Sequence, residues 1–187
     1  GYDALDNGGV SLSFDRFENA DQSYRFDGAD DFFSITGFTP QPTAITFQSW
    51  FKLPPSGVTG LNQIVDIAGV GGIAFLDDDL QGILYVNGAF TVPQFGTMLT
   101  DEWHMATFTY DGVTADVYLD GIRIARNGDA GSIDWSNTTN TIRIGTNFDE
   151  TEFFTSEIDD IQIYSRALLD TAIMDLYIQG GWPPASL

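Results

Sequence analysis

The sequence contains no cysteine and only one histidine, His104, among its 187 residues. No disulfide can therefore form, and the lack of thiolate and imidazole ligands argues against a zinc or copper site. The absence of cysteine does not identify the cellular compartment, because a secreted protein can rely on a large core or on bound calcium instead of disulfides.

Basic residues are also scarce, since 7 Lys and Arg stand against 27 Asp and Glu and give a formal net charge of −20. Nothing offers the basic patch that a nucleic acid or an anionic membrane surface requires, so we expect no nucleic-acid partner. No apolar run has the length of a membrane span, so we expect no membrane insertion. Acidity of this degree suits cation binding, solvation at high ionic strength, or repulsion between molecules.

The residues that are present are typical of a globular all-β domain, with 43% hydrophobic residues, 14% aromatic residues and 20 glycines. A chain of this length can bury a core of its own. We expect residues 1–179 to form one domain and residues 180–187, which contain two consecutive prolines, to be a linker or tail. We also expect the chain to be part of a larger multidomain protein.

The stretch 101–125 alternates apolar and polar residues with the period of two that marks strands with one buried face. Asp111-Gly112 and Asp120-Gly121 interrupt the alternation, and such pairs favour tight turns. The sequence therefore predicts a three-stranded antiparallel meander here.

Other runs rich in strand formers lie at residues 44–53, 63–67, 72–76 and 83–87. In the first of these, both alternating faces carry bulky side chains, which predicts a central strand. Turns follow about every ten residues, and no helical pattern separates the strands. This spacing predicts a sandwich of two sheets rather than a parallel sheet with crossover helices.

The two ends of the chain carry weaker signals. Alternating apolar residues at positions 10–14 predict a first strand, which we expect to pair with the closing strand. Residues 168–178 have apolar side chains at helical spacing, which predicts a short C-terminal helix. We expect Asp170 to cap its first turn and Gly180-Gly181 to end it.

Three segments of the sequence also match a known family pattern. They are SYRFDGADDFFSI at residues 23–35, the Trp-His, Tyr-Asp-Gly and Tyr-Leu-Asp-Gly elements within residues 103–121, and EIDDIQIYSRAL at residues 157–168. These segments resemble the signature of laminin G-like and pentraxin-like jelly rolls in the concanavalin A-like lectin and glucanase superfamily. The resemblance implies an all-β fold, namely a two-sheet antiparallel jelly-roll sandwich.

Calcium is the metal that the chemistry favours, because a hard cation takes six to eight oxygen ligands and clustered carboxylates beside turn carbonyls supply them. The first candidate set is Asp27, Asp30 and Asp31 from one turn, together with Asp159 or Asp160 from the closing strand. The resemblance to laminin G-like modules implies a structural ion there. Alternatively, these acids only form turns and solvated surface, since Asp is common in turns.

A second candidate set consists of Asp149 and Glu150 together with Asn62 or Gln63. Pentraxin-like relatives carry their ligand-binding calcium ions at this place in the fold. Their acidic motif is replaced here by Asn147-Phe148-Asp149-Glu150, so the match is looser than that of the first set.

Catalysis is disfavoured, and we expect no enzyme. The segment Glu157 to Gln162 resembles the strand on which laminarinase-type glucanases carry two catalytic carboxylates, but its last position is an amide. An amide replaces neither the nucleophile nor the acid/base that such hydrolysis requires. His104 has no serine-hydrolase motif around it, and a buried, hydrogen-bonded histidine is the simpler interpretation.

Sugar sites combine aromatic surfaces with a few directed polar groups, so aromatic residues in loops are the candidates for recognition. Trp135 with Asn137 in one loop, and Phe148 with Phe153 in another, are the residues that we predict to bind ligand. An equally good interpretation of Trp135 is a hydrophobic plug that anchors its own loop.

The sequence therefore predicts a non-catalytic, calcium-bearing carbohydrate-binding or cell-surface adhesion module of a larger secreted protein. Its partner would be a glycan or another cell-surface ligand, and its location extracellular or at the cell surface. A protein-binding or spacer domain without a sugar site is the first alternative, and a laminarinase-type glycan hydrolase is the second. Because this architecture serves many roles, the function has to be argued from a site.

Overall fold

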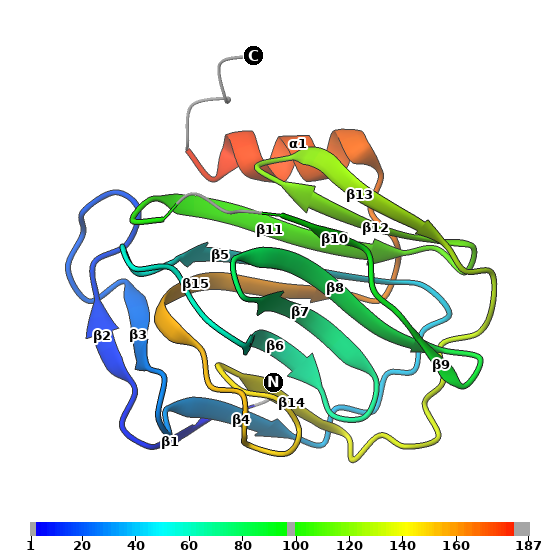
Figure 1. Cartoon of the computed structure of the whole chain (residues 1–187), viewed down its shortest axis with the longest axis horizontal. Helices are drawn as coiled ribbons and strands as arrows, with labels where there is room; N and C mark the ends of the chain where they lie inside the picture. Colours follow the sequence, from blue (N-terminus) through cyan, green and yellow to red (C-terminus); the bar gives the residue numbers. More distant parts are fainter. Residues whose placement is uncertain (1–2, 97–99, 182–187) are drawn as a thin grey trace.

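The computed structural model describes residues 3–96 and 100–181, and these form two antiparallel sheets packed face to face (Figure 1). One sheet has the strand order β1-β4-β14-β6-β7-β8-β10 with β9 paired to β8, and the other has the order β13-β12-β11-β5-β15-β3-β2. The first sheet contains β1 (Leu5–Asn7), β4 (Phe32–Thr36), β6 (Leu61–Ile67), β7 (Gly71–Leu76), β8 (Asp79–Val86), β9 (Ala89–Thr91), β10 (Gln94–Phe95) and β14 (Thr141–Ile144). The second contains β2 (Ser11–Ser13), β3 (Ser23–Asp27), β5 (Ile45–Lys52), β11 (Trp103–Tyr110), β12 (Thr114–Leu119), β13 (Ile122–Gly128) and β15 (Thr155–Tyr164). The predicted jelly-roll sandwich is confirmed.

The central meander is built as its alternation predicts, because β11 pairs with β12 and β12 pairs with β13. Every residue of β11 is buried, since Ala106 and Phe108 face the other sheet while Met105 packs in a second apolar cluster on the outside. The second turn needs a left-handed backbone at Asp120 and Gly121, whose φ angles are 51° and 80°. Asp-Gly is suited to such a turn.

The closing strand β15 lies inside the second sheet, between β5 and β3. The prediction that the first strand pairs with the closing strand is wrong, because β1 pairs with β4 in the other sheet and β2 pairs with β3. The physical reason is burial: β3 contributes the buried Phe26, whereas Ser11 and Leu12 of β2 are exposed, as suits an edge strand.

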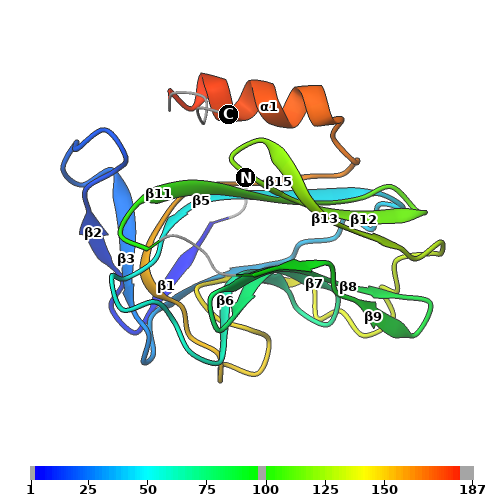
Figure 2. The ribbon, with the colours of Figure 1, turned by 45° about the horizontal axis from the view of Figure 1, so that its top comes forward.

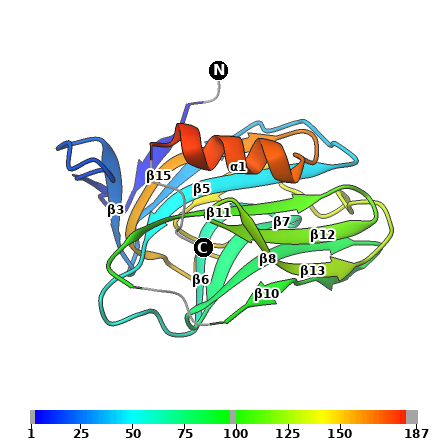
Figure 3. The same cartoon turned by 90° about the horizontal axis from the view of Figure 1, so that it is seen from above.

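The C-terminal helix α1 (Asp170–Gln179) lies across the outer face of the second sheet (Figures 2 and 3). Tyr177 stacks on Trp50 of β5, with ring centroids 5.6 Å apart. The helix ends at Gly180-Gly181 as predicted, but Asp170 does not cap it, because its carboxylate accepts a hydrogen bond from the Tyr118 hydroxyl at 2.8 Å. In the described part of the chain, no helix has the length and apolarity that crossing a membrane requires.

Arg16, in the loop between β2 and β3, holds the two ends of the fold together. Its buried guanidinium lies 4.5 Å from the ring centroid of Trp50 and pairs with Asp159 at 3.0 Å and with Asp160 at 2.9 Å. It also donates a hydrogen bond to the carbonyl of Gly180 at 2.9 Å. One side chain thus connects the early loop, the closing strand and the end of α1.

Arg16→Ala should lower the free energy of unfolding by about 3 kcal/mol, because it leaves the carboxylate of Asp159, whose side chain is only 13% exposed, without its cation. Lys52→Ala is the matched control, since Lys52 pairs with Asp101, whose side chain is 61% exposed, and such pairs contribute at most about 1 kcal/mol. Urea unfolding of both variants measures the difference. Equal losses in the two variants would show that Arg16 is an ordinary surface residue.

Candidate functional site

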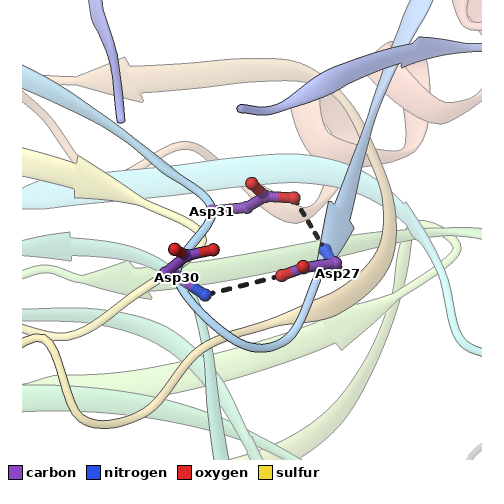
Figure 4. Close-up of side chains that lie close together, drawn as sticks. All are labelled: Asp27, Asp30 and Asp31. Atoms are coloured by element: carbon purple, nitrogen blue, oxygen red, sulfur yellow. Dashed lines mark hydrogen bonds between the residues drawn. The ribbon is translucent and has the colours of Figure 1, made fainter. Parts of the chain in front are cut away.

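The turn between β3 and β4 gathers three carboxylates, Asp27, Asp30 and Asp31 (Figure 4). One oxygen from each lies within 4.8 Å of the others. Oδ1 of Asp27 accepts a hydrogen bond from the backbone N–H of Ala29 at 2.8 Å, and Oδ2 of Asp31 accepts one from the N–H of Asp27 at 3.0 Å. Oxygens on opposite sides of a calcium ion are about 5 Å apart, so the spacing of this acidic turn fits one shared calcium ion.

The electrostatics of the acidic turn also favour a cation. Burial raises the pKa of Asp31, and the neighbouring carboxylates of Asp27, Asp30 and Asp6 raise it further. Among the residues that the structure describes, no arginine, lysine or histidine forms an ion pair with Asp27, Asp30 or Asp31. The negative charge of the turn is therefore not balanced by the protein itself.

Asp159 and Asp160 do not join the acidic turn. The register places Thr155, not Asp159, opposite Asp27. Asp159 lies four residues further along β15, which is about 13 Å at the usual rise of a strand. Both carboxylates are instead bound to Arg16, so the structure brings together only the three acids of the turn.

An open pocket of about 420 Å³ lies on the outer face of the first sheet. Asp66 of β6, Gly72 of β7 and Ile83 of β8 form one cross-strand row there, whereas Val65 and Leu84 point into the core. The loop between β14 and β15 forms one wall. This β6–β8 pocket is lined by Leu61, Gln63, Asp66, Gly69, Val70, Gly71, Ile83, Phe90, Val92, Asn147, Phe148, Asp149 and Glu152.

Asp66 is the most perturbed group of the β6–β8 pocket. It is only 8% exposed, and burial raises its pKa to about 7. The backbone N–H of Phe148 and the charge of Arg143 oppose this shift, while the carboxylates of Glu152 and Asp149 add to it. Burial and Asp149 also raise the pKa of Glu152. The pocket thus holds a carboxyl group that can change its charge near neutral pH.

Two aromatic rings stand at the mouth of the β6–β8 pocket. Phe90 is 64% exposed and Phe148 is 43% exposed, although rings of this size are normally buried. Phe90 packs against Tyr85 with ring centroids 4.9 Å apart, which fixes its position. The pocket therefore offers apolar surface beside carboxylate and amide groups, a combination found in small-ligand sites.

The four predicted ligand residues do not meet in one cleft, and only Phe148 lines the β6–β8 pocket. Trp135 packs against the core and donates from Nε1 to the carbonyl of Pro42 at 3.2 Å, as expected for an anchor of its loop. Phe153 packs against Phe32 and lines a separate, more polar pocket. Asn137 is exposed, and its carbonyl leaves no room for a side chain at Gly69, at one end of the β6–β8 pocket.

The second candidate metal set is not assembled either. Asn62 donates its amide hydrogens to the carbonyls of Thr59 and Gly60, at 3.0 and 3.2 Å. Glu150 is bound to Arg143 at 2.6 Å. Asp149 and the alternative member Gln63 line the β6–β8 pocket, but the Gln63 side chain is buried and donates from Nε2 to the carbonyl of Val65 at 2.9 Å. Within the described residues, the acidic turn is the one group of three close metal-ligating side chains.

The segment that resembles a glucanase strand is engaged in structural contacts. Glu157 is bound by Arg25 at 2.9 Å and accepts a hydrogen bond from Ser156 at 2.6 Å. Gln162 accepts a hydrogen bond from the Tyr164 hydroxyl. His104 is buried, with Nδ1 2.7 Å from a carboxylate oxygen of Asp120, as a structural histidine would be.

Sequence reasoning missed Asp66, Phe90 and Glu152. Asp66 carries a usable signal, because it is a single acid inside the apolar run Ile64 to Ile67. Phe90 follows the Asn87-Gly88 turn, so it belongs to the return strand of a hairpin and can face outward. Nothing local indicates that Glu152 comes to lie beside Asp66.

Comparison with known proteins gives a family and a fold. The laminin G sequence model described as the concanavalin A-like lectin/glucanases superfamily matches residues 27–174. A search of curated proteins finds no match to the sequence. The family match covers most of the chain, including the acidic turn and the β6–β8 pocket.

Several solved structures share the fold at low sequence identity. The receptor-binding domain of botulinum neurotoxin C/D mosaic serotype has a TM-score of 0.75 and 15% identity over 95% of this chain and 46% of that one. The botulinum neurotoxin serotype G binding domain has a TM-score of 0.75 and 15% sequence identity, and the match covers 96% of this chain and 47% of that one. The botulinum neurotoxin serotype D ligand-binding domain in complex with N-acetylneuraminic acid has a TM-score of 0.73 and 16% sequence identity. This match covers 95% of this chain and 46% of that one. This chain thus spans less than half the length of these structures.

The raised pKa of Asp66 predicts how its stability contribution changes with pH. The folded-state pKa of about 7 lies above the unfolded value of about 3.9, so the folded protein favours the protonated, neutral form of Asp66. The stability that this form contributes is fully present below pH 4 and is lost as pH rises through 7. Asp66→Asn cannot ionise and escapes this loss. Its melting temperature should match that of the wild type near pH 4 and exceed it by several degrees at pH 8, because each kcal/mol corresponds to roughly 2–4 °C.

Thermal unfolding followed by circular dichroism at pH 4 to 8 measures this difference. Asp175→Asn is the control, because it removes an exposed carboxylate of α1 that lies outside the pocket, and its effect should be the same across this pH range. A difference between Asp66→Asn and wild type that stays constant over this range would show that Asp66 ionises normally.

Proposed function

Because this chain belongs to the concanavalin A-like lectin/glucanases superfamily, we propose that it is a non-catalytic module that binds a carbohydrate in the β6–β8 pocket. The observation that carries the proposal is the pair of exposed rings, Phe90 and Phe148, beside the carboxylates of that pocket. A pyranose ring has an apolar C–H face and a rim of hydroxyl groups. Exposed rings suit the face, and the carboxylates of Asp149 and Glu152 suit the hydroxyl groups.

The nature of the similar structures supports a binding role. The botulinum neurotoxin domains are described as receptor-binding or ligand-binding, and two of the structures are complexes with SialylT and with N-acetylneuraminic acid. Because the chain covers less than half of those domains, a role as one module of a larger protein at the cell exterior or cell surface is consistent with the match. The superfamily also contains glucanases, but Gln162 stands where a catalytic carboxylate would be required.

We further propose that the acidic turn holds a structural calcium ion. Asp27, Asp30 and Asp31 would supply carboxylate oxygens to it. The ion would balance a cluster of negative charge that no basic residue of the described chain neutralises. The turn lies beside the start of the closing strand, since Asp27 is paired with Thr155, so its stability affects the packing of β15.

The glycan proposal predicts the effect of removing the rings. Screening immobilised glycans and measuring the best binder by calorimetry should give a defined affinity. The double variant Phe90→Ala/Phe148→Ala should weaken it by roughly ten-fold or more, since aromatic contacts contribute about 0.5–1.5 kcal/mol each beyond the area they bury. Phe95→Ala is the matched control, because Phe95 is 43% exposed but lies outside the pocket.

Two results would contradict the glycan proposal. If no glycan binds to folded protein, the protein-binding or spacer alternative replaces it. If the double variant binds as well as Phe95→Ala, the carbohydrate site lies elsewhere.

The calcium proposal predicts a change in thermal stability. Calcium added to protein dialysed against chelator should raise the melting temperature, because an ion bound only by the folded state stabilises it by about 2.7 kcal/mol at 100 times its Kd. This corresponds to roughly 5–10 °C for a domain of this size. Asp31→Asn should abolish the increase, whereas Asp149→Asn should keep it. A melting temperature that does not respond to calcium in the wild type would refute the structural ion.

A further inference from the structure

The lining of the β6–β8 pocket has one sign of charge. It contains the carboxylates of Asp66, Asp149 and Glu152, and among the described residues no lysine, arginine or histidine lines it. Carboxylates gathered in a concave, partly apolar site produce a concentrated negative potential. The pocket therefore attracts cations and repels anions.

The nearest basic residue does not neutralise this charge. Arg143 of β14 is the cross-strand neighbour of Asp66, but it forms no ion pair with Asp66. Its guanidinium binds Glu150 at 2.6 Å and lies 5.7 Å from the ring centroid of Phe32. Glu150 and Phe32 thus hold the guanidinium, whose charge opposes the raised pKa of Asp66 but which makes no ion pair with it.

Asp66 itself takes part in no ion pair among the described residues. A buried carboxylate without a cation is costly, and the single backbone N–H of Phe148 compensates only part of that cost. The raised pKa of Asp66 has the same cause, because burial disfavours its charged form. A positive group of the ligand beside Asp66 would supply the missing partner and would also meet Asp149 and Glu152.

The rest of the lining is largely apolar, so a matching ligand has an apolar surface next to its positive group. Val70, Ile83 and Val92 give the pocket an apolar lining, and Phe90 and Phe148 stand exposed at its edge. A hexose with a free amino group combines a C–H face with an ammonium group in one ring. A pocket of about 420 Å³ falls within the usual range for small-ligand sites.

We propose that the β6–β8 pocket selects glycans that carry free amino groups, and that it discriminates against sialylated glycans. This inference rests on the proposed function, because it assigns a charge to the carbohydrate of the same site. The expected ligand charge is opposite to that of N-acetylneuraminic acid, an anion, with which one of the similar structures was solved.

The test compares oligosaccharides of different charge on related backbones. Calorimetry at pH 7 and low salt measures binding of a glucosamine tetramer, of the N-acetylglucosamine tetramer with the same backbone, and of sialylated and unsialylated lactose. The amino tetramer should bind at least about ten-fold more tightly than its acetylated form, and the preference should fall as salt rises. Sialylated lactose should bind more weakly than lactose.

Three variants assign the effect to the pocket. Asp66→Asn should reduce the preference for the amino tetramer to about three-fold or less, and the stability predicted for this variant ensures that folded protein is tested. Glu150→Gln should also reduce it, because it releases Arg143 toward Asp66. Asp175→Asn removes one exposed charge from α1, on the outer face of the other sheet, and should leave the preference unchanged.

The outcomes separate the two proposals. Equal binding of the amino and acetylated tetramers, or tighter binding of sialylated lactose, would overturn the charge selectivity while the carbohydrate function stands. Binding of no oligosaccharide by folded protein, in this set and in the glycan screen, would overturn the carbohydrate function itself. A preference that survives Asp66→Asn would move the selecting charge out of the pocket.

Discussion

The insertion of the closing strand β15 between β5 and β3 is the constraint on which the rest of the structure depends. It aligns Thr155 with Asp27, so the acidic turn lies next to the start of the last strand. It also requires the loop that precedes β15 to fold back, and the backbone N–H of Gln63 donates to the carbonyl of Glu152 at 3.3 Å. One strand pairing thus positions both the acidic turn and a wall of the β6–β8 pocket.

The two outer faces of the sandwich are used differently. Helix α1 covers the outer face of the second sheet (Figure 3). Trp50 and Tyr177 belong to a small separate core there. In the described residues no helix covers the outer face of the first sheet (Figure 2). Asp66 and Ile83 therefore face a pocket rather than a second core. A second apolar cluster thus lies on one outer face of the sandwich, and the proposed recognition site lies on the other.

Features that are local in the sequence could be predicted from it. The meander of β11 to β13 follows from alternation and from Asp-Gly turns, and the acidic turn gathers residues from one segment of five positions, Asp27 to Asp31. The sequence could not show that Asp159 lies away from the acidic turn, because its distance from Asp27 depends on strand register. A one-residue difference in register exchanges the two faces of a strand, and β15 carries a bulge between Asp159 and Gln162.

The pocket shows the same limit. Asp66, Phe90 and Glu152 come from three separate segments, and only the order of strands in the sheet brings them together. The orientation of Trp135 could not be predicted either. A loop has no alternation of apolar and polar residues that would tell whether its tryptophan faces solvent or the core. Its hydrogen bond to Pro42 and its packing against the core depend on contacts between residues that are far apart in the sequence.

The central claim is that the β6–β8 pocket is the ligand site, and an NMR titration of isotope-labelled protein with the glucosamine tetramer tests it most directly. The account predicts saturable shift changes confined to the backbone amides of β6, β9 and the loop from Asn147 to Glu152, with Asp66 and Phe90 among the largest. Changes centred on the Trp135 loop or on α1, with the pocket unaffected, would contradict it.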